Sequence, residues 1–112
     1  MASTFKNAIA AGLGTSLTTV YTAPGATTTT IIGLSVANVL GTGFSTAADV
    51  RLVKSGGGSS AYIVKNADIP VGGSMVVVGG DQKLVLQTGD YIQVRASEAV
   101  SVDVIISVLE LT

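Results

Sequence analysis

Short runs of alternating hydrophobic and polar residues cover most of the chain. Along 100–108 every even position is Val or Ile, whereas Ser101, Asp103 and Ser107 take odd positions. Along 90–97, Ile, Val and Ala alternate with Tyr, Gln and Arg. A period of two is typical of a β-strand that buries one face and exposes the other. Both segments are therefore predicted to be strands with one face in the core, and Val100 is expected to lie on that face.

Six further segments rich in Val, Ile and Thr are separated by Gly, Asn and Asp, which is typical of short strands joined by turns. They are 17–22, 28–38, 49–54, 60–65, 74–78 and 83–87. Within 28–38 we expect Ile32, Leu34 and Val36 to share the core face. The segment Asn66–Pro70 is predicted to be a loop because Pro70 cannot donate a ladder hydrogen bond. About eight antiparallel strands cannot bury their apolar faces as one flat sheet, so we predict an all-β fold, either an antiparallel β-sandwich or a jelly-roll-like barrel.

The length of 112 residues fits one domain, which we place at 17–112. Residues 1–16 are predicted to form an N-terminal arm or an edge strand, with the arm slightly favoured. Residues 40–48 are predicted to form a loop whose tip, Phe44, either anchors a partner or folds back over the end of the sandwich. The candidate interface residues are Phe5, Ile9, Leu13, Phe44 and Tyr91.

The composition indicates that something other than water covers part of the protein surface. Charged residues make up 12% of the chain and hydrophobic residues 47%, whereas soluble domains average about 25% charged residues. No segment approaches the roughly 18 apolar residues of a membrane-spanning helix. We therefore expect burial against other protein subunits, with extensive Ser and Thr coverage as the alternative. The N-terminal run MASTFKNAIAAGLG is a weak signal-peptide candidate, so we expect production in the cytoplasm without secretion.

The residue types present exclude several classes of function. The net charge is −1 and the six cations are dispersed, so nucleic-acid binding lacks its electrostatic footprint. Histidine and cysteine are both absent from the sequence, which excludes Ser-His-Asp and Cys-His triads and thiolate or imidazole metal sites. Asp81 and Asp90 lie in Gly-rich turns and are expected to stabilise those turns rather than act as an acid pair. We expect no enzyme activity, no cofactor and no metal.

Four segments resemble a family of proteins. They are VYTAP at 20–24, TIIGLSVAN at 30–38, IPVGGS at 69–74 and VVGGDQKLVLQTGD at 77–90. With the terminal SVLE at 107–110, they are similar to small virion structural proteins of tailed bacteriophages, often marine or cyanobacterial, over roughly residues 17–111. The motifs are those of turns and strands rather than of a catalytic site.

The resemblance implies a virion component located on the capsid surface, namely a decoration or cement protein that binds the major capsid protein. A homo-oligomer is also expected; copies that meet around a threefold axis would form a head-to-tail ring, so a trimer is the expected form. Residues 1–16 and 40–48 are expected to contribute most to docking. The alternatives are a neck or tail subunit (connector or fibre) and a glycan-binding adhesion module.

Overall fold

A computed structural model of the protein describes residues 2–41 and 43–112. These residues form nine β-strands and a single turn of 3-10 helix, η1 (Ser55–Gly57). The strands are β1 (Ser3–Leu13), β2 (Thr18–Thr22), β3 (Thr28–Asn38), β4 (Thr46–Val53), β5 (Ser60–Ile69), β6 (Ser74–Val78), β7 (Leu84–Leu86), β8 (Tyr91–Ala96) and β9 (Val102–Leu111).

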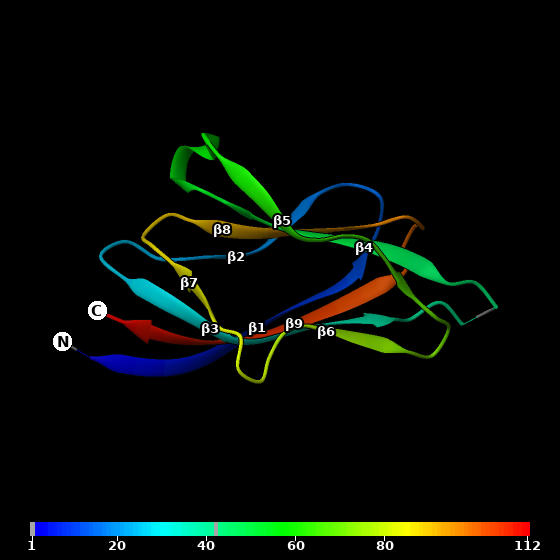
Figure 1. The fold of residues 1–112 in the computed structure, drawn as a ribbon, viewed down its shortest axis with the longest axis horizontal. Coiled ribbons are helices and arrows are strands. Elements are labelled where there is room, and N and C mark those ends of the chain that lie inside the picture. Colours follow the sequence, from blue (N-terminus) through cyan, green and yellow to red (C-terminus); the bar gives the residue numbers. More distant parts are fainter. Residues whose placement is uncertain (1, 42) are drawn as a thin grey trace.

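The strands form two antiparallel sheets that pack face to face, as Figure 1 shows. Sheet A has the order β1-β9-β3-β6, and β7 also pairs with β3; sheet B has the order β2-β8-β4-β5. The pairs are nested, because β4 pairs with β5, β3 with β6 and β7, β2 with β8, and β1 with β9. A long hairpin rolled into two sheets in this way is a jelly roll, so the predicted all-β sandwich is confirmed.

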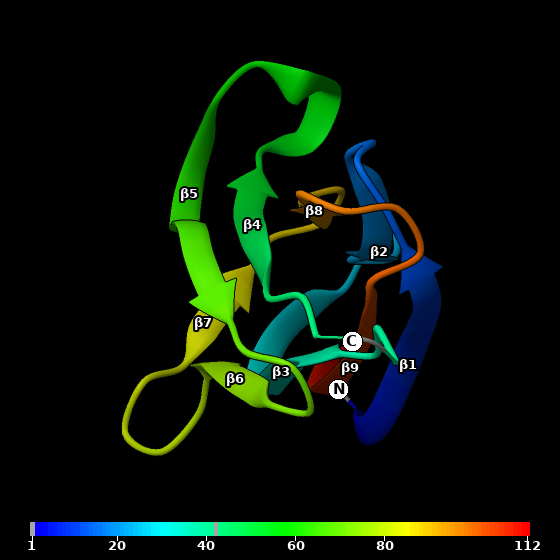
Figure 2. The same cartoon turned by 90° about the vertical axis from the view of Figure 1, so that its right-hand side faces the viewer.

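The core lies between the sheets and is built from the alternating positions that the sequence pattern singles out. The even residues of β9 and β8 are buried. The two strands belong to opposite layers of the sandwich (Figure 2). The largest fully buried side chains are Ile31, Leu34, Ile69, Leu86, Ile92 and Ile106. Because each strand buries every second residue, each sheet retains an outer face made of the other half of its residues.

Residues 3–13 form β1, an edge strand of sheet A paired with β9 from Ser3–Leu111 to Leu13–Val102. The two chain ends therefore lie side by side, at the left of Figure 1. Leu13 was predicted to be an interface residue, and this prediction is wrong because Leu13 is 8% exposed and belongs to the core. A register shift between Ala10 and Leu13, with Gly12 at φ +66°, ends the regular alternation of β1 just before Leu13.

The predicted loop at Asn66–Pro70 is instead largely strand, because β5 continues to Ile69. Asn66 adopts φ +54° and its N–H donates to Asp49 Oδ1 at 2.7 Å. This bulge keeps the strand in the sheet, and residues 67–69 then pair with residues 46–48. For the same reason β4 begins at Thr46, inside the segment predicted to be a loop.

Two predicted core positions are also corrected. A register shift between Ile31 and Gly33 makes Ile31 fully buried and leaves Ile32 half-buried. Val100 is 67% exposed at φ +49° in the β8–β9 connection, and β9 begins two residues later. In both places a local departure from extended geometry breaks the period of two on which the prediction depended.

Candidate functional site

The outer face of sheet B is polar and carries much of the positive charge. Arg51 lies opposite Gln93, and its Nε and Nη2 atoms donate to Gln93 Oε1 at 3.0 and 2.8 Å. Lys65 Nζ lies 4.5 Å from the centroid of the Tyr62 ring, within cation–π range. The polar groups of this face therefore bind mainly to one another.

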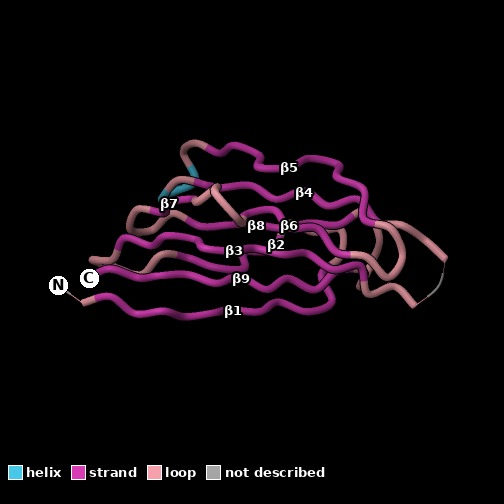
Figure 3. The backbone as a smooth tube through the Cα atoms, turned by 60° about the horizontal axis from the view of Figure 1, so that its bottom comes forward, coloured by secondary structure: helices cyan, strands magenta, loops and turns pink. Residues whose placement is uncertain are grey.

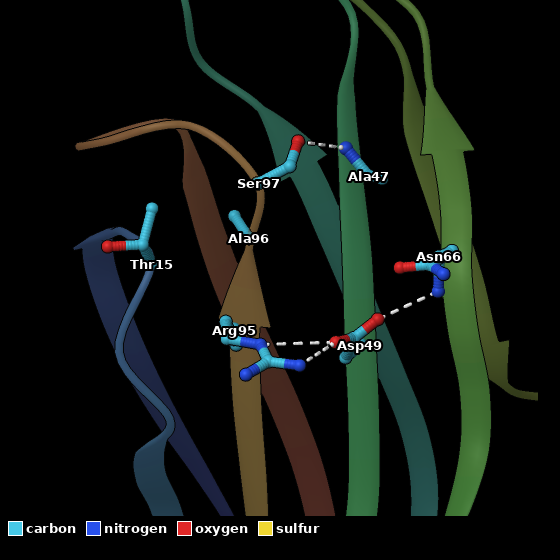
Figure 4. Close-up of a pocket in the computed structure, with 7 residues that line it drawn as sticks. All are labelled: Thr15, Ala47, Asp49, Asn66, Arg95, Ala96 and Ser97. Atoms are coloured by element: carbon cyan, nitrogen blue, oxygen red, sulfur yellow. Dashed lines mark hydrogen bonds and ion pairs between the residues drawn. The ribbon is translucent and has the colours of Figure 1, made fainter.

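A polar pocket at one end of this face is built around Asp49 (Figure 4). Asp49 Oδ2 accepts from Arg95 Nη2 at 2.6 Å and from Nε at 3.1 Å, while Oδ1 accepts from Asn66 N–H. Burial of the carboxylate disfavours its charge, but the hydrogen bonds from Asn66 and Arg95 outweigh burial and lower the pKa of Asp49. Asp49 is thus a tightly bonded anion that ties β4 to β5 and β8.

Asp90 has a similar structural role at the opposite end of sheet B. Its carboxylate accepts from Lys54 Nζ at 2.8 Å and from the N–H groups of Ser55 and Gln87, both at 3.0 Å. Burial opposes ionisation, and these three donors outweigh it and lower the pKa of Asp90. The prediction that Asp90 stabilises its turn is confirmed.

A third polar cluster lies between the sheets. Tyr21 Oη donates to Glu110 Oε2 at 2.5 Å and lies 2.9 Å from Thr29 Oγ1, while Lys6 Nζ is 2.9 Å from Glu110 Oε1. Burial, followed by the bond to Glu110, raises the pKa of Tyr21 to about 12. The hydrogen bond from Tyr21, followed by that from Lys6, lowers the pKa of Glu110. The cluster links β2 of sheet B to β1, β3 and β9 of sheet A.

The outer face of sheet A has the opposite character. Several of its large hydrophobic side chains project into solvent, and together we call them the apolar face. They are Phe5, Ile9, Val76, Val85 and Ile105, which are 75%, 73%, 70%, 56% and 53% exposed. A contiguous exposed apolar surface on a small protein usually marks a site of interaction with another protein.

Strand register places these side chains in two rows across the sheet. Residues directly opposite in antiparallel strands point to the same side. One row runs from Phe5 through Leu109 and Thr30 to Val85. The second row runs from Ile9 through Ile105 and Ser35 to Val76. The apolar face therefore crosses the whole sheet from β1 to the opposite edge.

A shallow depression of about 260 Å³ lies beside the second row, between Val76 and Ile105. Its floor is formed by small residues, among them Gly33, Ser35 and Ser107. The depression is therefore lined by small residues, with Val76 and Ile105 beside them.

Charge is nearly absent from this face. Among the described strand residues of sheet A, the charged ones are Lys6, Asp103 and Glu110. Lys6 and Glu110 pair with each other on the inner side of the sheet, since Lys6 lies opposite the buried Val108. Asp103 lies on the outer side, at one end of β9, where its Oδ1 accepts the Gly12 N–H at 2.8 Å. Both rows are therefore free of charged side chains over the described part of the chain.

The structure separates the residues that the sequence grouped as an interface. Phe5 and Ile9 lie together on the apolar face. The β3–β4 connection lies at the end of the sandwich away from the termini (Figure 1). Phe44, within this connection, is 64% exposed, so it does not fold back over that end. Tyr91 is half-buried on the outer side of sheet B, opposite Val53. Leu13 is in the core.

The sequence reasoning missed Val76, Val85 and Ile105. One signal was available, because Ile105 stands at an odd position of the segment 100–108, where the other odd residues are Ser101, Asp103 and Ser107. A large apolar residue on the face predicted to be exposed indicates a contact surface. Val76 and Val85 carry no such signal, because their short strands do not show which side faces the core.

Comparison of the chain with protein-family models, with curated proteins and with solved structures found no match. Over residues 2–41 and 43–112, the structure contains no helix long and apolar enough to cross a membrane. The same residues contain no group of three or more acidic side chains placed to hold a metal ion.

Proposed function

We propose that the protein is a non-enzymatic structural subunit of a virion, and that its apolar face docks onto the shell formed by the major capsid protein. The observation that carries the proposal is the contrast between the two outer faces. Sheet A presents the two uncharged rows that contain Phe5, Ile9 and Ile105, whereas sheet B presents bonded Arg, Lys and Asp side chains. Such a contrast suits a molecule with one face against a protein and the other against solvent.

Energetics support this role. Fully burying one large apolar side chain contributes about 1.5–3 kcal/mol, so a few side chains of the apolar face give a modest affinity for each copy. Modest contacts are sufficient where one docked subunit makes several of them with the shell at once, because after the first contact forms the others are intramolecular. The low content of charged residues follows from the same role, since a face buried against the shell needs no charge for solubility.

The fold is compatible with this function. Jelly rolls occur in viral capsid proteins, and also in lectins and cupins. Because one fold supports many functions, the argument depends on the apolar face rather than on the topology. The resemblance to phage virion proteins is an independent line of support, since it arises from the turn and strand motifs.

The proposal is tested by the copy number and location of the protein in particles of the phage that encodes it. Quantitative mass spectrometry would be applied to intact virions and to isolated tails. Hundreds of copies per virion, absent from tails, are the expected result. A few copies that fractionate with tails or necks would move the subunit to that location, and absence from virions would refute a structural role.

A matched pair of variants tests the docking face itself. Ile105→Asp places a charge within the second row, and Thr19→Asp places the same charge on an exposed strand position of sheet B, opposite Gln93. Binding to particles that lack the protein is expected to be lost for Ile105→Asp and kept for Thr19→Asp. Equal binding by both variants would show that another surface docks.

A further inference from the structure

The edges of the two sheets differ in how well they are protected against pairing with another chain. Within the described residues, sheet A ends at β1 on one side and at β6 and β7 on the other, and sheet B ends at β2 and β5. A free edge is a template for a further strand unless bulges, charges or short length prevent pairing. The four edges can therefore be compared on those three features.

Three of the edges are protected. The edge formed by β6 and β7 is short and interrupted, because β6 has five residues, β7 has three, and a turn separates them. β2 has five residues and a register shift between Thr19 and Tyr21. β5 is long, but its pairing with β4 has two irregularities, Asn66 lies at φ +54°, and Lys65 and Asp68 are charged.

β1 is the least protected of the four edges. It has 11 residues, its register with β9 is unbroken from Ser3 to Ala10, and Lys6 is its single charged residue. The Lys6 ammonium is held by Glu110 of the same chain at 2.9 Å, on the inner side of the sheet. Figure 3 shows β1 as the outermost strand of its sheet, beside β9.

The hydrogen-bond pattern shows which residues of β1 present their backbone to the free edge. Ala2 and Thr112 exchange two hydrogen bonds, N–H to O, of 3.2 and 2.9 Å. In an antiparallel pair such hydrogen-bonded positions alternate with positions whose N–H and C=O groups point away from the partner. The even residues of β1 therefore bond to β9, and Ser3, Phe5, Asn7 and Ile9 direct their backbone groups outward.

The side chains of the same odd residues lie on the apolar face, so this edge is self-complementary. When a second copy of β1 lies antiparallel about a two-fold axis at Asn7, Phe5 of each copy is opposite Ile9 of the other. Aromatic and β-branched residues make favourable cross-strand pairs. A register centred on Lys6 would instead place two ammonium groups opposite each other, which is unfavourable. The register about Asn7 also uses every outward backbone group from Phe5 to Ile9.

We propose that two copies of the protein pair through β1, antiparallel and centred on Asn7, so that their A sheets become one continuous sheet with a single extended apolar face. The contact is the same on both subunits and closes with two copies, so the assembly is a dimer rather than the trimer expected from the sequence. The dimer does not depend on the proposed docking to a shell. It would present both apolar faces on one side, as a larger surface for any partner.

The first test measures the mass of the purified protein by light scattering and sedimentation from about 1 μM to about 1 mM, a range that covers weak to moderate affinities. The wild type is expected at twice the chain mass of 11.1 kDa. Asn7→Pro removes a backbone donor that points to the free edge and not to β9, a position where an edge strand tolerates proline. This variant is expected to be a monomer, and Asn7→Ala, which keeps the N–H, is expected to remain a dimer.

A second test fixes the register and does not depend on the proline variant folding. The chain has no cysteine, so Asn7→Cys introduces a single thiol at the two-fold axis. Opposite hydrogen-bonded residues have Cα atoms about 5.5 Å apart, which suits a disulfide. Ser3→Cys is the control, because residue 3 of one copy would lie about 27 Å along the strands from residue 3 of the other.

Oxidation is expected to convert Asn7→Cys to a covalent dimer at least tenfold faster than Ser3→Cys. A wild type that stays monomeric across the concentration range, a trimer mass, or equal cross-linking of the two cysteine variants would overturn the proposal. These measurements use the protein alone, so failure of the dimer and failure of shell docking are separate results.

Discussion

Adjacent isoleucines in β9 offer a direct test of how the sandwich divides its residues between core and surface. Ile106 is 1% exposed and lies between Ala8 of β1 and Leu34 of β3. Its neighbour Ile105 is 53% exposed on the apolar face. Ile106→Ala and Ile105→Ala remove the same atoms from the same strand, so any difference between them arises from the side of the sheet they occupy.

The expected magnitudes follow from burial. Truncating a fully buried Ile to Ala costs about 2–5 kcal/mol, because transfer free energy is lost and a cavity is left. Unfolding a chain of 112 residues carries an entropy of about 0.24 kcal/mol/K, so each kcal/mol lowers Tm by about 4 °C. Ile106→Ala should therefore lower Tm by about 8–20 °C. Ile105→Ala leaves no closed cavity and should cost less than about 1 kcal/mol, or about 4 °C.

Thermal unfolding followed by circular dichroism, with urea denaturation of the same variants, would measure both losses. Particle binding would be measured in parallel, and it is expected to weaken for Ile105→Ala at a temperature where both variants are folded. Equal destabilisation by the two substitutions would refute the assignment of β9 residues to an inner and an outer side.

Two further predictions concern ionisation. The folded-state pKa values of Asp49, Asp90 and Glu110 are lowered, so the stability they contribute is complete above their unfolded values and is lost as pH falls below about 4.5. Because the chain has no histidine, Tm should be nearly constant from about pH 5.5 to 8; a large change there would contradict this expectation. Tyr21 has its pKa raised to about 12, so stability should fall as pH rises above 10. Tyr21→Phe should abolish that alkaline loss. By leaving Glu110 Oε2 without its donor, it should also cost about 1.5–3 kcal/mol at pH 7 in urea denaturation; unchanged stability would show that the bond is not formed in solution.

The predicted pH dependence arises from three buried carboxylates that hold separate parts of the fold together. Asp49, Asp90 and Glu110 each bridge segments that are distant in sequence, and each is bonded by at least two donors. Among the described residues, no buried side-chain nitrogen or oxygen lacks a hydrogen-bond partner. The interior is therefore satisfied without a ligand, and the surface that remains without a partner is the apolar face.

Alternation of residue types was sufficient to predict most strands, because a side chain's position on a regular strand follows from a period of two alone. Strands β8 and β9 have their predicted core faces over Ile92 to Ala96 and Val102 to Val108. Alternation failed where the backbone leaves extended geometry, as at Ile32 and Asn66. Such bulges depend on partners from other strands, for example the Asp49 carboxylate, which no local pattern contains.

The apolar face depended on tertiary structure for the same reason. Phe5, Val76 and Ile105 come from strands far apart in the chain, and strand pairing brings them onto one side of one sheet. Low charge content already indicated that some surface is covered, since composition does not depend on how strands pair. Which surface it is could not follow from composition, because a residue's neighbours across a sheet are set by register between strands, and register is a property of the folded chain.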